Sequence, residues 1–255
     1  MLRLVPSWLV IVILITLPLP CLLQASDSDP SGWTVELETG ALWFSRNRAR
    51  IPSDTGTNVD LRDLTGSGGD PYVRLYVSYD FNERHSARLN LAPVRETGTG
   101  TLDRMVMFDG EEFEADTPTR AIYKFNTYRL TYRWTFHRSD GWDLGLGAAL
   151  LVRDAHIELR QGDVRAKKSD LGLVPLLHLY GARHFTDRTS LVLDFEGAAA
   201  PQGRAIDVAL QLRHVLPTGW HVYGGYRMLE GGADNSSVYT FAWLHHATAG
   251  IGYGF

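Results

Sequence analysis

Residues 127–136 read Thr-Tyr-Arg-Leu-Thr-Tyr-Arg-Trp-Thr-Phe, so polar and apolar side chains alternate without a break. Successive side chains of an extended strand point to opposite faces. This segment therefore has one face of aromatic and leucine side chains and one face of threonine and arginine. The same period of two recurs at residues 142–153 and 206–213. The pattern predicts β-strands whose two faces meet different surroundings.

Ten segments of this kind are predicted along the chain. We expect strands at Trp33–Ser45, Pro71–Phe81, Arg84–Val94, Thr119–Phe136, Gly141–Leu159, Asp170–Phe185, Thr189–Ala199, Arg204–His214, Gly219–Leu229 and Val238–Phe255. Short turns alternate with outer links at Arg46–Asp70, Arg95–Pro118, Gly162–Lys168, Pro201–Gly203 and Glu230–Ser237. An even number of strands places both ends of the chain on one side, as a membrane barrel requires. Eight strands is the alternative, if a weaker central pair forms an extended outer loop.

The positions of the aromatic residues indicate which face meets lipid. Aromatic side chains lie beside the predicted short turns at Trp134, Phe136, Trp142 and Trp220, and near the opposite strand ends at Tyr239, Phe241 and Trp243. Two such girdles mark the two interfaces of a membrane. Strands can cross a membrane only as a closed barrel, because every backbone polar group must be paired. We therefore predict an all-β, closed antiparallel transmembrane β-barrel with short periplasmic turns. A secreted lipocalin-like barrel, with its apolar face inward, is the alternative.

The last strand points to a specific kind of barrel. Ala247, Ala249, Ile251, Tyr253 and Phe255 form one face, and the residues between them are small or weakly polar. This segment resembles the C-terminal strand of bacterial outer-membrane β-barrel proteins. The resemblance implies that Tyr253 and Phe255 are part of the signal read by the barrel-assembly machinery. Together with the strand count, it makes the chain similar to the small OmpA/OmpW-like outer-membrane barrels.

The start of the chain predicts export. Arg3 is followed by an almost wholly aliphatic run from Leu9 to Leu19, and Leu23-Gln24-Ala25 offers a cleavage site before Ser26. These are the parts of a secretory signal peptide. We expect residues 1–25 to be a cleaved signal peptide and residues 26–255 to be the barrel in the outer membrane of a Gram-negative bacterium. An uncleaved anchor and a lipoprotein attached through Cys21 are the alternatives.

Composition excludes several classes of function. Cleavage after Ala25 removes the single cysteine, so the mature chain has no disulfide or thiolate metal site. It also removes Arg3, so the net charge of −4 becomes one unit more negative and gives no basis for nucleic-acid binding. We predict no metal site and no cofactor. Adjacent strand residues face opposite sides, so His245 and His246 do not chelate one ion.

The inward faces of the predicted strands carry many charges. We expect a lumen charge cluster made by Arg129, Arg133, Asp194, Glu196, Asp207, Arg213, Arg227 and His178. Counting outward from the turns places Asp207 opposite Arg227, Arg213 opposite His221, Tyr180 opposite Asp194 and His178 opposite Glu196. Paired and hydrogen-bonded charges are tolerated in a small barrel, which predicts a salt-bridged plug. The alternative is a narrow polar path beside the small residues Gly145, Gly147, Ala149, Ala209 and Gly225.

Two loop segments and one possible catalytic pair complete the functional expectations. The basic run at residues 46–50 is expected on an outer rim, where outer-membrane lipids and lipopolysaccharide are the available partners. The acidic segment at residues 111–116 is expected to be a solvated loop. His178 and Glu196 resemble a base and its orienting group, but no serine completes the set, and no catalytic residue is predicted. We expect a non-enzymatic protein that is structural, receptor-like or a narrow passage. An enzyme acting on lipid or peptide is the alternative.

Overall fold

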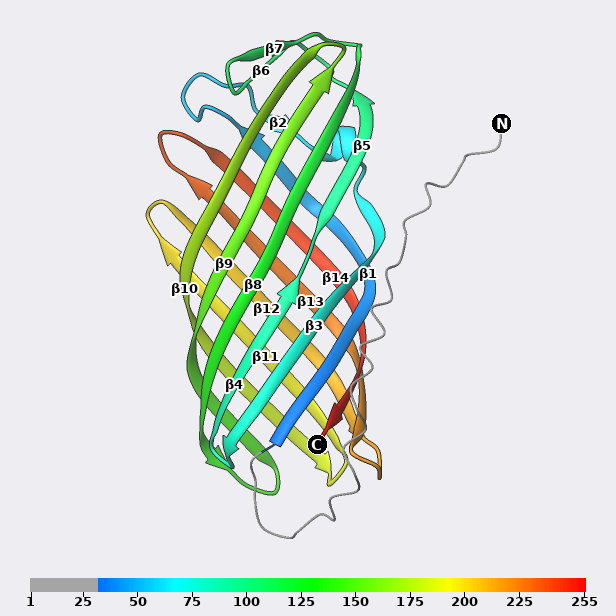
Figure 1. The fold of residues 1–255 in the computed structure, drawn as a ribbon, viewed down its shortest axis with the longest axis vertical. Helices are drawn as coiled ribbons and strands as arrows, with labels where there is room; N and C mark the ends of the chain where they lie inside the picture. Colours follow the sequence, from blue (N-terminus) through cyan, green and yellow to red (C-terminus); the bar gives the residue numbers. More distant parts are fainter. Residues whose placement is uncertain (1–31) are drawn as a thin grey trace, which may run out of the picture.

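A computed structural model describes residues 32–255, and the predicted signal peptide lies outside the described residues. Ten antiparallel strands form a closed barrel, because the first strand, β1 (Gly32–Arg50), pairs with the last, β14 (Tyr239–Gly254) (Figure 1). Between them lie β3 (Gly68–Asn82), β4 (His85–Ala92), β8 (Pro118–Arg138), β9 (Trp142–Gln161), β10 (Val164–Thr186), β11 (Thr189–Ala200), β12 (Gly203–Val215) and β13 (Trp220–Asp234). The ten-strand prediction is confirmed and the eight-strand alternative is wrong. Over residues 32–255, no helix is both long enough and apolar enough to cross a membrane.

The two faces of the wall are those predicted. On β8, Leu130 and Trp134 expose 56% and 44% of their surface on the outside, whereas Arg129 exposes 4% on the inside. The outer face of β1 carries exposed side chains from Trp33 toward the outer rim. Trp43 packs against the rings of Tyr226 and His245 on the same face. A strand tilted by about 45° crosses the hydrocarbon layer in roughly ten residues. The band from Trp33 to Trp43 fits that length, and the inward-facing lipocalin-like alternative is excluded.

The strands extend beyond the membrane farther than predicted. β9 and β10 are joined by a turn at residues 162–163 in place of the expected link to Lys168, and β13 continues to Asp234. The basic run at residues 46–50 belongs to β1 and is not a loop. There Arg46 lies over the ring of Phe241, and Arg50 lies over Tyr239. The added ends of β1, β9 and β10 carry mainly polar and charged residues on their outward faces, so hydrophobic alternation does not reveal them.

The outer rim of the barrel is stepped. Strands β8, β9 and β10 rise highest, whereas the β11–β12 hairpin, yellow in Figure 1, ends far lower. β10 pairs with β9 along Val164–Arg183 but with β11 only along Leu177–Thr186. Over Val164–Leu176, the only strand paired with β10 among the described residues is β9. This leaves a gap in the wall between the upper part of β10 and the β11–β12 hairpin.

The long links fold into the outer half of the barrel instead of remaining open loops. They form β2 (Val59–Asp60), α1 (Arg62–Thr65), β5 (Arg95–Thr101), β6 (Val106–Phe108) and β7 (Glu111–Phe113). Their apolar side chains pack against inward-facing residues of the wall. This cluster, here called the outer plug, includes Leu42, Phe44, Leu61, Leu64, Phe108, Phe113, Leu159 and Leu244. The expectation of a solvated acidic loop at residues 111–116 is wrong in part, because Phe113 is fully buried.

Candidate functional site

A charge network crosses the lumen beneath the outer plug. It contains four arginines and four carboxylates, all on inward-facing strand positions and connected through ion pairs: Arg74, Arg88, Arg129, Arg227, Glu38, Asp194, Glu196 and Asp207. The formal charges of this set cancel. We call it the lumen network. Because the opposite charges are also hydrogen-bonded, they are tolerated inside the barrel.

Asp207 is the centre of the lumen network. Its carboxylate lies 2.6 Å from Arg227, 3.1 Å from Arg129 and 3.2 Å from Arg74. Arg129 also pairs with Glu196, whose other oxygen accepts a hydrogen bond from Thr131 at 2.6 Å. These contacts join strands β3, β8, β11, β12 and β13 across the barrel, so the network ties opposite walls together.

The predicted cluster residues separate into three groups. Arg129, Asp194, Glu196, Asp207 and Arg227 lie in the lumen network. Arg213 lies closer to the periplasmic end, where it pairs with Glu36 at 2.6 Å. Arg133 stacks on the ring of Tyr180 with its guanidinium 4.1 Å from the ring centre. His178 lies beside the network and is described below.

The predicted register is right at one turn and wrong at another. His178 pairs with Glu196 and Tyr180 with Asp194, as predicted. Asp207, however, pairs with Leu229, and Arg213 pairs with Tyr223, so the prediction around residues 216–218 is shifted by two residues. The turn is centred one residue later than assumed, because the N–H of Leu216 donates to the carbonyl of Trp220. A shift of two keeps each side chain on the same face, and Asp207 and Arg227 still meet diagonally.

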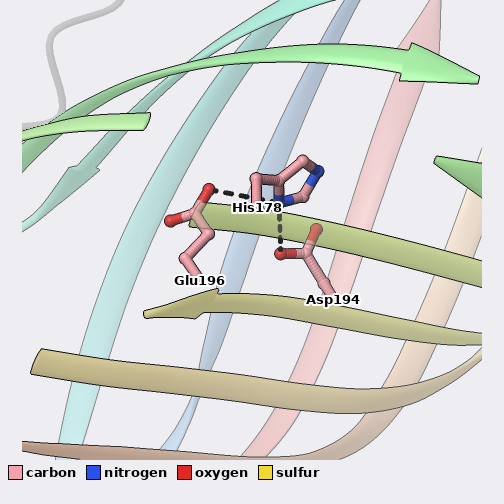
Figure 2. Close-up of side chains that lie close together, drawn as sticks. All are labelled: His178, Asp194 and Glu196. Carbon is pink, nitrogen blue, oxygen red and sulfur yellow. Dashed lines mark ion pairs between the residues drawn. The ribbon is translucent and has the colours of Figure 1, made fainter. Parts of the chain in front are cut away.

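His178, Asp194 and Glu196 lie close together in the lumen, as Figure 2 shows. The Nδ1 atom of His178 is 3.8 Å from Asp194 and 3.7 Å from Glu196, and it donates a hydrogen bond to the carbonyl of Phe195 at 3.2 Å. Arg88 already binds Asp194 at 2.5 Å and Glu196 at 3.1 Å. A metal would need Nδ1 deprotonated and both carboxylates free of cations. The donor set therefore does not fit a metal ion.

Some lumen residues were not predicted, and Glu38 is the most important. It is fully buried and contacts Arg74 and Arg227. The signal was present, because Val35 and Leu37 face outward and Glu36 and Glu38 alternate with them. Glu36 also binds His221, with 2.8 Å between the carboxylate and Nε2. Inspection of the first strand for its polar face would have found both acids.

The lumen differs on the two sides of the network. Toward the periplasm there is a polar cavity of about 130 Å³ that reaches Arg88, Arg133 and Arg213. The expected space beside Gly145 is occupied by Arg133 and Tyr180, and Ala209 is fully buried. Above the network the ring of His246 packs edge-on against Tyr72, and the outer plug follows.

A second cavity, here called the outer cleft, lies in the outer half of the barrel. It has a volume of about 530 Å³. Its apolar lining comes from both the tall and the low side of the rim and includes Tyr123, Phe125, Leu151, Ile157, Val174, Val238 and Phe241. Such a volume is within the range of about 300–1,000 Å³ that small-molecule sites have.

Basic residues surround this apolar lining. Arg153, Lys168 and Arg204 line the outer cleft, and Asp170 is its single acidic lining residue. Arg153 donates a hydrogen bond from Nε to Asp170 at 3.0 Å, and Arg204 donates one to Glu230 at 3.0 Å. His156 is nearby on β9, where burial and the charges of neighbouring lysines lower its pKa. The outer cleft thus combines an apolar interior with cationic groups.

Neither a protein-family model nor a curated protein matches the sequence. Among solved structures, the outer membrane protease OmpT from Escherichia coli is similar, with a TM-score of 0.56, 11% identity and coverage of 91% of this chain and 99% of that chain. The beta domain of the Bordetella autotransporter BrkA has a TM-score of 0.47 and 13% identity, covering 89% of this chain and all of that chain. The attachment invasion locus protein Ail of Yersinia pestis has a TM-score of 0.42 and 11% identity, with 88% and 99% covered.

These similarities concern the fold. The chain has the fold of the small outer-membrane β-barrels, which supports an outer-membrane location.

Proposed function

We propose that this protein is a closed, non-enzymatic and receptor-like outer-membrane barrel, whose ligand-binding surface is the outer cleft. The observation that carries this proposal is the lumen network, in which Arg129, Glu196 and Asp207 each expose only a few percent of their side chains. A solute crossing the barrel would have to break several buried ion pairs and then pass the outer plug. Separating a buried pair costs about 3–5 kcal/mol, which argues against the narrow passage.

Planar bilayer recordings test this proposal. Purified protein, with insertion verified by its resistance to added protease, should give no discrete conductance steps. Steps from the native protein that shift in size when Arg129, Arg133 or Arg227 is neutralised would overturn it. A porin of known conductance, recorded under the same conditions, is the positive control that shows inserted channels are detected.

The enzymatic alternative rests on His178 and Glu196, which lie 3.7 Å apart. Their geometry supports it poorly, because Arg88 and Arg129 bind the carboxylate and Nδ1 of His178 donates its hydrogen bond to the carbonyl of Phe195. We expect no turnover of fluorescent phospholipids or of a mixed peptide library. Turnover that disappears in His178→Ala and Glu196→Gln variants, while both remain folded, would establish the enzyme instead.

We further propose that Tyr253 and Phe255 act as the signal for the barrel-assembly machinery. The ring of Tyr253 stacks on Phe255, and the backbone of Phe255 pairs with Trp33 at 2.9 Å, where the barrel closes. A Phe255→Ser variant should refold in detergent like the native protein but should reach the outer membrane of cells in reduced amount. Equal amounts in cells would argue against the signal.

A further inference from the structure

The outer cleft lies against the gap in the barrel wall. On one side it is lined by Lys168, Asp170 and Val174 of β10, and on the other by Arg204 and Ala205 at the start of β12. The wall hydrogen bonds between β10 and β11 stop above Leu177 and Gly197, and Arg204 and Ala205 of β12 pair with the outer end of β11. The barrel wall beside the cleft is therefore not continuous between β10 and β12.

The gap begins at the level of the outer membrane interface. Leu173 of β10 pairs with Val152, which in turn pairs with Tyr128 of β8. Tyr128 is the last outward aromatic residue on β8, and the next outward position is Asn126. The outer interface therefore lies near this part of β10, and lipid headgroups lie beside the gap.

Two leucines mark the outside of the gap. Leu171 and Leu173 expose 76% and 64% of their surface, more than the lipid-facing leucines lower on the same strand. Large apolar side chains at an interface favour contact with acyl chains. An acyl chain beside these leucines needs to move only past the free edge of β10 to reach the apolar lining of the cleft.

The charges of the cleft indicate the headgroup. Arg153, Lys168 and Arg204 face a single acidic lining residue, Asp170, so an anionic group is favoured. The existing partners of these cations are held in partly exposed pairs, with Lys168 3.7 Å from Asp109. Exposed pairs are weak and exchange readily. A phosphate can therefore take over guanidinium and ammonium donors without leaving a buried charge unpaired.

From these observations we propose that the outer cleft binds an acyl chain of a phosphate-bearing lipid of the outer leaflet, which enters through the gap between β10 and β11. This inference rests on the proposed function, because it assigns the ligand class of the same surface. A free phosphate would leave the apolar lining unused. An extended peptide paired with the edge of β10 would meet Pro175, which has no N–H to donate.

Photocrosslinking in nanodiscs tests the proposal. The full-length protein is placed in phosphatidylcholine nanodiscs that contain a small fraction of a phosphatidic acid with a diazirine on one acyl chain. Crosslinks should appear on inward-facing cleft residues such as Ile157 and Val174, in addition to the outward residues that any surrounding lipid labels. Crosslinks confined to outward residues such as Leu130 and Leu150 would overturn the proposal.

Matched variants separate the cleft from the barrel surface. Ala155→Trp fills the cleft and should abolish the inward crosslinks, whereas Ala148→Trp, on the lipid-facing side of β9, should leave them unchanged. Lys168→Gln should reduce them severalfold, whereas Lys167→Gln, on the opposite face, should not. Equal effects within either pair would contradict the proposal.

Further arms identify the part of the lipid that is bound. Competition by soluble glycerol phosphate alone would indicate a phosphate site, and competition by an extended peptide would indicate a peptide site; either result would overturn the lipid assignment. Loss of inward crosslinking together with a silent bilayer recording would refute this inference but leave the proposed function standing.

Discussion

At the centre of the lumen, Asp207 balances three arginines, and its removal should be costly. An Asp207→Asn substitution removes the negative charge that Arg74, Arg129 and Arg227 share, while the three arginines remain close together. Breaking a buried pair in this way should lower the free energy of unfolding by about 3–5 kcal/mol. Urea-induced unfolding in lipid vesicles measures this loss of unfolding free energy. Asp103→Asn, at an exposed position, is the control. A change below about 1 kcal/mol would mean that water reaches the network.

A second residue-scale prediction concerns pH. Glu96 on β5 lies near Asp70 above the membrane, and burial, followed by the charge of Asp70, raises the pKa of Glu96 from 4.5 to about 7. Between these values the folded protein keeps a proton that the unfolded chain releases, so stability falls as pH rises from about 4.5 to about 7. Glu96→Gln should therefore raise the melting temperature by a few degrees at pH 8 and leave it unchanged at pH 4. The exposed Glu112→Gln should show no such difference, and an equal gain at both pH values would contradict the assignment.

The face of each lumen residue was predictable, but its strand partner was predicted correctly only between β10 and β11. The alternation of β12 and β13 placed Asp207 and Arg227 inside, and this depends only on the period of two. Their exact register depends on the turn at residues 216–218, and the two-residue error kept both side chains inward. Contacts across the lumen, such as Arg74 with Asp207, join strands far apart in sequence, and no local pattern encodes them.

At the scale of elements, the membrane-spanning strands were predictable and the outer elements were not. Lipid outside and charge inside impose a strict alternation on β8, β9 and β12. Above the membrane this constraint ends, and β1 continues to Arg50 with basic residues on its outer face. The outer plug is built from short pieces such as α1 and β6, whose few apolar residues have no period to detect.

The contact between α1 and β5 should be sensitive to a single methyl group. A Cβ atom added at Gly100 would overlap the backbone oxygen of Asp63, and one at Gly98 would overlap that of Leu64. Gly100→Ala should therefore displace α1 and speed proteolysis within residues 59–65, while the barrel stays folded. Gly181→Ala is the control, since its Cβ would lie 3.8 Å from Leu144. Unchanged proteolysis of Gly100→Ala would show that the outer plug adapts.

For the molecule as a whole, the lumen is closed twice, by chemically different means. The lumen network is polar and balanced, whereas the outer plug is mainly apolar. Each layer spans the barrel at its own height. Opening a continuous path therefore requires the loss of both layers, so neither one acts as a gate by itself.

Bilayer conductance separates the two layers. A first variant replaces Arg129, Arg227, Glu196 and Asp207 by alanine, which removes two charges of each sign. A second replaces residues 59–65 by glycine and serine at constant length, which removes Leu61 and Leu64 from the outer plug. Each variant alone should remain silent, because the other layer still blocks the lumen, and the combined variant should show small discrete steps. Conductance from the first variant alone would mean that the outer plug does not seal the barrel, and a silent combined variant that is properly inserted would mean that a third barrier exists.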